Sequence, residues 1–320
     1  MTKRIALGTW SWGNQLLWKY NPDSDEELFR TYQEALRSGF TLIDTADSYG
    51  TGQFSGRSER LLGDFYQMVP QGQTNKIKIV TKLAPYPWRL GRNGFTGPFL
   101  NSFQRLNNKL DIVQLHWSTA KYNPFQEIQL LNNLCDLIDR GYDFRIGLSN
   151  IGPNRLRQII KFLSERNQKI KSVQVQFSLL APDLEKQTKV KQICENNNID
   201  FLGYSPLAFG ILCKDPNHIQ KIKGFNLRDL ILKTYEKPTL QLRKCIHEIA
   251  ISRSVSMAQV AINWSCYQGV IPIIGLRKTS QVKDASGVLS WDLTQSEFEE
   301  LEDASKKLNR RMPSNPFTSN

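Results

Sequence analysis

Short apolar segments alternate with amphipathic helical segments along the 320-residue chain, and this alternation limits the fold more than any other feature. The apolar segments are typical of buried parallel strands, and each is followed by enough chain for a helix. We predict strands over residues 5–10, 40–43, 77–81, 112–115, 144–148, 173–176, 201–204 and 270–274. About eight such units favour a closed (β/α)8 TIM barrel that occupies residues 1–320 as one domain.

Amphipathic helices fill the intervals between these strands. The best marked one covers residues 25–38, because acidic residues occupy its first turn and Gly39 follows its last turn. Further helices are predicted over 58–65, 128–140, 154–166 and 186–197, from residues 239 and 256 onward, and over 296–308. A doubly wound Rossmann sheet would show the same alternation, but its glycine fingerprint should follow the first strand. Tryptophans stand there instead, and Gly50, Gly52 and Gly56 lack the required spacing and are expected to form a flexible loop.

Composition excludes several classes of protein. The apolar content is 40%, but no apolar run approaches the ~20 residues of a transmembrane helix, and no signal-peptide core follows Met1. We therefore expect a soluble, cytoplasmic protein without a membrane partner. The five cysteines are far apart and only three histidines are present, so a metal site or a disulfide framework is disfavoured and buried, reduced thiols are expected.

The formal net charge of +12 raises the question of an acidic partner. Lysines and arginines are scattered among acids on the predicted helices, without an arginine-rich run, so nucleic acid is not the expected partner. A small anionic ligand would explain the charge, and so would solubility alone. Both interpretations stay open at this point.

Two segments lack a clear secondary-structure pattern. The aromatic segment 10–18 follows the first strand, and its rings either line a pocket or cover the barrel end as packing. The segment 206–238 is basic and could close over a bound anion as a lid. Otherwise it is a surface excursion with a short helix near 227–233. The tail after residue 308 is expected to be loosely ordered.

Three successive predicted strands end in Asp44, Lys82 and His116, and Tyr49 lies in the loop after the first of them. Each has an ordinary explanation when taken alone: the acid as a helix cap, the lysine as a surface residue, the histidine as a structural residue. In a barrel, active groups gather at the carboxyl ends of the strands, so these four side chains are expected at one rim. Together they can act as an acid and base set.

The residue types in this set suggest reduction of a carbonyl group. A tyrosine hydroxyl has a pKa of ~10, and the Lys82 ammonium is expected to lower the pKa of Tyr49. Asp44 would keep Lys82 charged and in position, and His116 would donate to the carbonyl oxygen of the substrate. These groups supply neither a metal nor a covalent nucleophile, so the hydride would come from a nicotinamide cofactor.

The four residues and their neighbours resemble the catalytic tetrad of the aldo-keto reductase superfamily. The matching motifs are Asp-Thr-Ala-x-x-Tyr-Gly at 44–50, Thr-Lys at 81–82 and Leu-His at 115–116, and the resemblance covers essentially the whole chain. It implies a (β/α)8 barrel that binds NADPH in extended form and reduces a small-molecule carbonyl substrate. It also implies that Tyr49 is the general acid, that Lys82 and Asp44 tune it, and that His116 directs the substrate.

The same resemblance implies contacts with the nicotinamide half of the cofactor. Ser149, Asn150 and Gln174 would hold the nicotinamide carboxamide. Tyr204 would stack on the nicotinamide ring, although core packing is the alternative for this side chain. The pyrophosphate would lie against Ser205, Pro206 and Leu207.

The adenosine half would lie at the last strand. Gly275 and Arg277 belong to the segment for the adenosine phosphate, where Arg277 would face the 2′-phosphate as a multidentate donor. Gln281 and Asp284 would contact the adenosine. Ala285 stands where the family usually has an adenine-binding asparagine, so a preference for NADPH rests mainly on Arg277 and Lys278.

Segments 8–18, 44–52, 84–90 and 114–120 are similar to those of pyridoxal reductases from plant chloroplasts and cyanobacteria. This resemblance implies reduction of pyridoxal to pyridoxine in vitamin B6 metabolism. The flat pyridine ring would be clasped by Trp10, Trp18, Trp88 and Trp117. A broad-specificity aldehyde or ketone reductase is the alternative. A second alternative is a nucleotide-sensing module like the potassium-channel β-subunits, which share the fold and much of the site.

Overall fold

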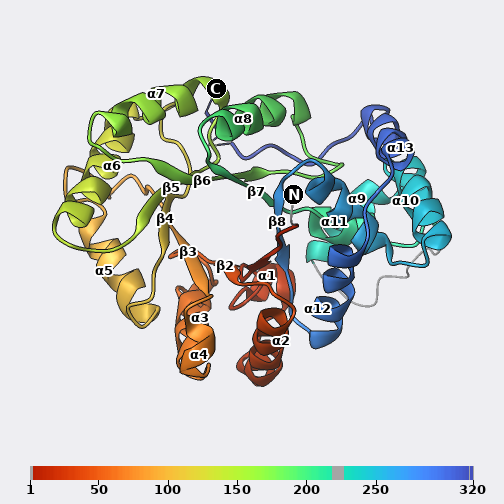
Figure 1. The fold of residues 1–320 in the computed structure, drawn as a ribbon, viewed down its shortest axis with the longest axis horizontal. Coiled ribbons are helices and arrows are strands. Elements are labelled where there is room, and N and C mark those ends of the chain that lie inside the picture. Colours follow the sequence, from red (N-terminus) through yellow and green to blue (C-terminus); the bar gives the residue numbers. More distant parts are fainter. Residues whose placement is uncertain (1–2, 218–226, 317, 320) are drawn as a thin grey trace.

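Eight parallel strands close into a barrel in chain order in the computed structural model, which describes residues 3–217, 227–316, 318 and 319 (Figure 1). The strands are β1 (Ala6–Gly8), β2 (Leu42–Asp44), β3 (Lys78–Leu83), β4 (Ile112–Leu115), β5 (Arg145–Ser149), β6 (Ile170–Gln176), β7 (Asp200–Tyr204) and β8 (Ile271–Gly275). β8 pairs in parallel with β1, and this pairing closes the barrel. The predicted (β/α)8 barrel is confirmed, and the open Rossmann sheet is excluded.

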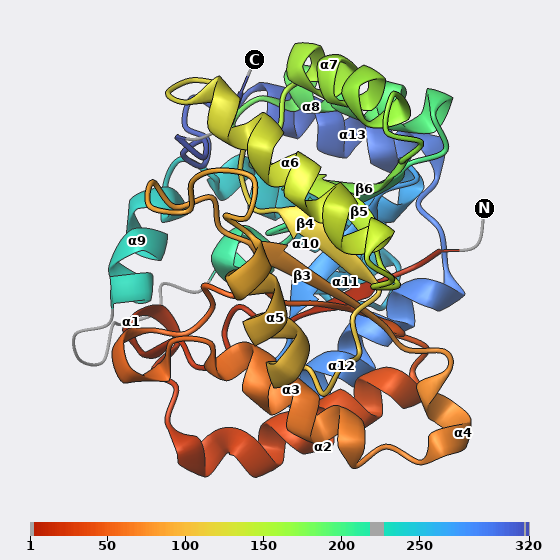
Figure 2. The same cartoon turned by 90° about the vertical axis from the view of Figure 1, so that its left-hand side faces the viewer.

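Helices lie outside the strands (Figures 1 and 2). They are α1 (Gln15–Trp18), α2 (Asp25–Arg37), α3 (Arg57–Gln67), α4 (Gln71–Thr74), α5 (Thr96–Arg105), α6 (Pro124–Asp139), α7 (Pro153–Ser164), α8 (Leu184–Asn196), α9 (Leu227–Glu236), α10 (Leu240–Ser252), α11 (Met257–Tyr267), α12 (Thr279–Ser286) and α13 (Gln295–Lys306). Short 3-10 helices occur as η1 (Pro22–Ser24), η2 (Gly52–Phe54), η3 (Ala208–Cys213) and η4 (Gly287–Ser290).

The predicted helices are present, with ends shifted by a few residues. α2 begins with three acidic residues and Gly39 follows it at φ 83°, as the sequence predicts. α13 begins one residue earlier than predicted, because Thr294 and Glu297 form a capping box around its first turn. α1, α4, α5 and α12 are absent from the sequence prediction. α5 carries Gly97 and Pro98 in its first turn, and α12 has only eight residues, so neither shows a strong periodic pattern.

Side chains inside the barrel form two layers. The apolar layer consists of Ala6, Leu42, Val80, Ile112, Leu202, Ile271 and Ile273. Side chains alternate between the two faces of a strand, so the residues two positions farther along share the same inner face. On β2, β3 and β4 these residues are Asp44, Lys82 and Gln114, and all three are buried. We call these three, together with Gln174 of β6, the polar layer.

Asp44 and Lys82 belong to the strands, whereas the sequence places Lys82 just after its strand. Asp44 is the last residue of β2, and Leu83 still follows Lys82 in β3. His116 comes directly after β4, as predicted. The prediction ended β3 too early because a lysine was taken as the end of a buried strand, but this inward-facing lysine is held by side-chain partners.

The glycine-rich loop after β2 is a tightly bonded turn, unlike the flexible loop expected from the sequence. The Gly56 N–H donates to the Tyr49 carbonyl oxygen at 3.0 Å, and the Thr51 N–H donates to the Gly13 carbonyl oxygen at 3.1 Å. Gly50 has φ 110°, and a Cβ atom there would lie 1.8 Å from the Phe54 carbonyl oxygen. Only glycine fits this position, and the turn fixes the backbone next to Tyr49.

The basic segment 206–238 is described in part. It contains η3 and α9, and α9 confirms the short helix expected near 227–233. Lys221 and Lys223, which the lid prediction included, lie outside the described residues. α9 packs beside α1 (Figure 2), so this segment approaches the aromatic segment that follows β1.

The described part of the tail packs against the barrel, so the expectation of a loosely ordered tail is wrong there. The Met312 N–H donates to the Leu180 carbonyl oxygen at 2.9 Å. The Ser319 hydroxyl accepts from the Gly152 N–H at 3.1 Å. Both Met312 and Ser319 are buried, and they hold the tail near the ends of β5 and β6.

The cysteines are all free, but only Cys135 and Cys194 are buried, so the expected burial holds for two of the five. Burial raises the pKa of both buried thiols. Within residues 3–217 and 227–316, none of the helices combines the length and the apolar content that a bilayer crossing needs.

Candidate active site

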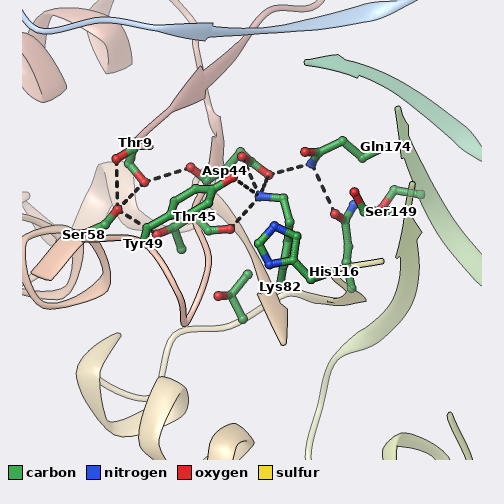
Figure 3. Close-up of polar contacts among 12 residues, drawn as sticks. Thr9, Asp44, Thr45, Tyr49, Ser58, Lys82, His116, Ser149 and Gln174 are labelled. Carbon is green, nitrogen blue, oxygen red and sulfur yellow. Dashed lines mark hydrogen bonds and ion pairs between the residues drawn. The ribbon is translucent and has the colours of Figure 1, made fainter. Parts of the chain in front are cut away.

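Lys82 and Asp44 form a buried ion pair in the polar layer. Lys82 Nζ lies 2.8 Å from each carboxylate oxygen of Asp44 and also donates to the Thr45 carbonyl oxygen at 2.7 Å (Figure 3). Burial raises the pKa of Asp44 and lowers the pKa of Lys82, while their mutual attraction opposes both shifts. The direct contact of Nζ with both oxygens is the geometry of an ammonium paired with a carboxylate.

Tyr49 completes this group from the loop after β2. Its hydroxyl lies 3.0 Å from Lys82 Nζ (Figure 3). The expected lowering of the Tyr49 pKa is wrong, because burial raises this pKa well above its ordinary value and the negative charge of Asp44 adds to the shift. Asp44 neutralises the lysine charge that was expected to acidify the phenol, so the cost of burying a phenolate dominates. Tyr49 is therefore held in its protonated form.

His116 faces the Tyr49 ring. The two ring centroids lie 5.9 Å apart at an interplanar angle of 71°. Burial lowers the pKa of His116 well below its ordinary value, and the positive charges of Lys82 and Arg89 act in the same direction. The imidazole is therefore neutral, with one nitrogen as a donor and one as an acceptor. Its Nδ1 lies 3.2 Å from the Ser48 hydroxyl.

Hydroxyl groups support the strand end that carries Asp44. Thr9 Oγ1 donates to the Asp44 carbonyl oxygen at 3.0 Å and lies 2.6 Å from Ser58 Oγ. Ser58 Oγ also lies 3.0 Å from Thr45 Oγ1 (Figure 3). These buried contacts join α3 to the residues that directly follow β1 and β2, and they fix the position of the ion pair.

A row of amides continues the polar layer across the barrel. Gln174 Nε2 donates to Asp44 Oδ1 at 2.7 Å and to Gln114 Oε1 at 3.2 Å, and Gln114 Nε2 donates to Ser172 Oγ at 2.9 Å. A Cβ atom on Gly147 would lie 2.7 Å from both Gln114 Cγ and Ser172 Oγ. Gly147 thus leaves room for this row. Of its members, the sequence prediction included Gln174 but missed Gln114 and Ser172.

Asn150 and Tyr204 lie next to this row. The Tyr204 hydroxyl donates to Asn150 Oδ1 at 2.8 Å, and Asn150 Nδ2 donates to the His116 carbonyl oxygen at 3.0 Å and to Ser149 Oγ at 3.1 Å. Asn150 has φ 55°, a left-handed conformation that asparagine tolerates well. The structure thus brings Ser149, Asn150, Gln174 and Tyr204 together beside the candidate tetrad.

The segment after β7 turns sharply. Ser205 has φ 55°, and its carbonyl oxygen accepts from the Ala208 N–H at 2.9 Å. Pro206 is buried and Leu207 is half-buried within this turn, which leads into η3. Its position at the end of β7 places it next to Tyr204.

Arg277 lies two residues after the end of β8. Its Nη1 donates to the Trp18 carbonyl oxygen at 2.7 Å, and no described carboxylate forms an ion pair with it. Burial lowers the pKa of Arg277, and the positive charge of Arg228 adds to this shift. The Arg228 guanidinium lies 4.7 Å from the centre of the Trp18 ring. The two guanidinium groups repel each other, so they form a positive region suited to an anion.

The residues expected at the adenosine end are only partly directed toward such a ligand. Gly275 is exposed at the end of β8. Gln281 Oε1 accepts from the backbone N–H groups of Arg277 and Lys278 at 2.9 and 3.2 Å. Asp284 instead accepts from Ser256 Oγ and Gln259 Nε2 at the start of α11. Ala285 is buried.

Comparison with known proteins identifies the relatives of this chain. A model of the aldo/keto reductase family matches residues 4–306. The chain belongs to the aldo/keto reductase family. As an aldo/keto reductase it is an oxidoreductase that acts on small carbonyl substrates and uses NAD(P)H.

The curated relatives cover nearly the whole of this aldo/keto reductase. It is 40% identical over 316 residues to the chloroplastic pyridoxal reductase of Arabidopsis thaliana, with 98% of this chain and 86% of the relative covered. It is 26% identical to the aldo-keto reductase YhdN of Bacillus subtilis, with 93% and 88% covered.

A solved structure shows the same architecture. The glycerol dehydrogenase AKR11B4 of Gluconobacter oxydans has a TM-score of 0.77 at 25% identity, with 98% of this chain and 94% of that chain covered. The thermostable reductase Tm1743, solved with the inhibitor epalrestat, has a TM-score of 0.71 at 20% identity, with 94% of each chain covered. The second likeness supports the fold alone.

The four tryptophans expected around the substrate take part in two sets of ring contacts. Trp10 lies edge-on to Trp18 at 6.3 Å and 5.7 Å from Phe209, near Arg277. Trp117 lies 5.2 Å from His116. Trp88 belongs to this second group through Tyr86. The second group borders the candidate tetrad through the contact of Trp117 with His116.

Sequence reasoning also missed the ion pair of Asp47 and Arg89. Asp47 lies within the motif that carries Tyr49, and its carboxylate contacts Arg89 from the loop after β3. The acid at 47 was visible in the sequence. Its partner was not, because forty-two positions separate the two residues and nothing in the local pattern links them.

Proposed function

We propose that this enzyme reduces pyridoxal to pyridoxine with NADPH and that Tyr49 donates the proton. The contact of Lys82 Nζ with both the Asp44 carboxylate and the Tyr49 hydroxyl carries the proposal. It places a protonated phenol against a buried, fixed charge pair and beside the neutral His116. The 40% identity to a pyridoxal reductase supports this substrate.

Tyr49 has the properties of a proton donor. Its raised pKa keeps the phenol protonated at neutral pH. When the carbonyl oxygen of a substrate gains negative charge, the phenol can give up its proton to that oxygen, and Lys82 Nζ, 3.0 Å away, stabilises the phenolate that is left. Asp44 and the Thr45 carbonyl oxygen keep Lys82 in place during this transfer.

His116 orients the substrate carbonyl in this proposal. A neutral imidazole can donate one hydrogen bond without competing with Tyr49 as an acid. The Asn150 amide braces the His116 backbone, because its Nδ2 donates to the His116 carbonyl oxygen. The Tyr49 ring, from the loop after β2, and the His116 ring, directly after β4, have centroids 5.9 Å apart, and the carbonyl oxygen would lie beside both.

NADPH fits the residues around the tetrad. When bound, NADPH supplies the hydride that reaches the carbonyl carbon. Ser149, Asn150, Gln174 and Tyr204 would hold its nicotinamide end, and Ser205, Pro206 and Leu207 its pyrophosphate. Arg277 would bind the 2′-phosphate, because it is a guanidinium without a described carboxylate partner. Gly275, Gln281 and Asp284 would border the adenosine, although Asp284 would first have to leave Ser256 and Gln259.

A flat, aromatic aldehyde suits the wall of the site. Trp117 lies against His116, and Trp88 stacks on Tyr86 beside it. Stacking on such rings favours a pyridine ring over a small aliphatic chain. Trp10 and Trp18, near Arg277, are assigned to the cofactor side of the site.

Turnover of pyridoxal tests this function. Purified protein is mixed with NADPH and pyridoxal, and NADPH loss is followed by absorbance while pyridoxine is measured by chromatography. Equal amounts of NADPH consumed and pyridoxine formed are expected. A panel of aliphatic and aromatic aldehydes separates a pyridoxal reductase from a broad-specificity reductase, which would use many of them with similar kcat/KM. NADPH binding without turnover of any aldehyde would instead indicate a nucleotide-sensing module and contradict the proposal.

A further inference from the structure

A second buried ion pair lies beside the candidate tetrad. The Asp47 carboxylate accepts from the Ala84 N–H, at 3.2 Å to Oδ1 and 3.4 Å to Oδ2, and from the Arg89 guanidinium. Arg89 Nη1 also donates to the Ala84 carbonyl oxygen at 2.7 Å. The side chain of Asp47 is 3% exposed and that of Arg89 is 17% exposed. The pair joins the loop that carries Tyr49 to the loop after β3.

The loop after β3 carries aromatic side chains that reach His116. The Arg89 guanidinium carbon lies 4.9 Å from the centre of the Tyr86 ring. Tyr86 stacks on Trp88 at 4.7 Å and 13°, and it meets Trp117 edge-on at 5.8 Å. Trp117 in turn lies 5.2 Å from the His116 ring. We call Tyr86, Trp88 and Trp117 the aromatic wall, and Arg89 is the charged group behind it.

The charges of the pair also act on the tetrad. Asp47 raises the pKa of Lys82, and Arg89 lowers the pKa of His116. The charged or titratable groups that face Asp47 are Arg89 and Tyr86 from the loop after β3, Glu59 from α3 and Lys82 from β3. Burial raises the pKa of Asp47 to about 6, Arg89 opposes this shift, and Glu59 adds to it.

We propose that Asp47 and Arg89 are positioning residues that set the affinity for aromatic carbonyl substrates by holding the aromatic wall against His116. This inference rests on the proposed function, because it concerns the substrate of the same site. Neither residue touches the reacting atoms. The Asp47 carboxylate fixes Arg89 over Tyr86, and a ring that stacks on the wall depends on this contact. A small aliphatic aldehyde needs only the tetrad.

Two variants separate this role from a general effect on the site. Asp47→Asn removes the charge that holds Arg89, and Arg89→Met removes the guanidinium while keeping an apolar stem beside Tyr86. For both we expect the KM for pyridoxal to rise roughly tenfold, which corresponds to the loss of one aromatic or cation–π contact. The KM for propanal, the kcat for both aldehydes and the Kd for NADPH should change much less.

Arg92→Gln is the matched control. Arg92 lies three residues after Arg89 in the same loop and pairs with Asp136 of α6, away from the aromatic wall. It should leave the KM for both aldehydes at the wild-type value. The decisive quantity is the KM for pyridoxal divided by the KM for propanal. If this ratio is the same in Asp47→Asn and Arg89→Met as in Arg92→Gln, the positioning role is wrong.

The pH dependence adds a readout that a merely structural role would not change. As the pH falls through about 6, wild-type Asp47 takes up a proton and loses its charge pair with Arg89. The KM of wild type should then approach that of Asp47→Asn. The KM of Asp47→Asn for pyridoxal divided by the KM of wild type for pyridoxal should fall toward one below pH 6. Ionisation of pyridoxal cancels in this ratio. A ratio that stays constant from pH 5 to pH 8 contradicts the proposal.

Two further measurements keep the outcomes distinct. Calorimetric titration with pyridoxal in the presence of NADP⁺ compares affinities without turnover, so a wild-type protein that binds pyridoxal but fails to consume NADPH contradicts only the proposed function. If Asp47→Asn unfolds, Arg89→Lys carries the test. It keeps a cation for Asp47 but removes the planar group over Tyr86, so the KM for pyridoxal should rise about threefold. An unchanged KM in a folded Arg89→Lys protein would contradict the inference.

Discussion

The two layers inside the barrel differ in chemistry although they share strands and face. On β3, Val80 lies in the apolar layer and Lys82, two residues later, lies in the polar layer. The same step separates Leu42 from Asp44 on β2. A buried charge costs several kcal/mol unless it is paired, whereas a buried valine contributes to stability directly. The apolar layer can therefore tolerate gradual change, but the polar layer depends on each partner.

Lys82→Met breaks the polar layer and is expected to have the largest effect. It leaves the buried Asp44 carboxylate with Gln174 Nε2 as its remaining described hydrogen-bond donor, so the free energy of unfolding should fall by roughly 3–5 kcal/mol. Turnover should be lost as well, because no cation then stabilises the Tyr49 phenolate. Urea unfolding and NADPH consumption measure the two effects. Wild-type turnover in a folded Lys82→Met protein would remove Lys82 from the mechanism.

Val80→Ala breaks the apolar layer on the same strand. Removing two buried methyl groups should lower the free energy of unfolding by about 2 kcal/mol. The kcat for pyridoxal should stay close to wild type, because Lys82 keeps its partners. Urea unfolding and steady-state kinetics on the same preparation give both numbers. A large loss of kcat with little change in stability would show that the layers are not separate in function.

Arg277→Ala changes a residue outside both layers, so it shows what a substitution does when neither layer is disturbed. It should change neither stability nor kcat much, and should weaken binding of NADPH roughly 10- to 100-fold through loss of a charge-assisted contact with the 2′-phosphate. Binding of NADH should hardly change. Titration of both cofactors against the variant makes the comparison, and equal losses for the two would exclude the 2′-phosphate role.

The sequence predicts the barrel and the tetrad better than it predicts the electrostatics. Strand and helix alternation is a local pattern, and Asp44, Lys82 and His116 stand at recognisable places in it. The direction of the Tyr49 pKa shift was predicted wrongly, because it depends on how Asp44 neutralises Lys82 and on how deeply the phenol is buried. Both are properties of the packed structure.

Long-range partners and side-chain directions were also beyond the sequence. Asp47 and Arg89 come from different loops, and only the fold shows that they meet. The sequence also does not show that the Trp18 carbonyl oxygen accepts from Arg277 or that Trp117 lies beside His116. An aromatic residue in a loop does not indicate which neighbour its ring will meet.

The central claim is that the polar layer holds Tyr49 as the proton donor, and Tyr49→Phe tests it most directly. The variant keeps the ring and removes only the hydroxyl that contacts Lys82. The kcat for pyridoxal with NADPH should fall roughly 10²- to 10⁴-fold while the Kd for NADPH stays at the wild-type value. Wild-type kcat in Tyr49→Phe would contradict the account.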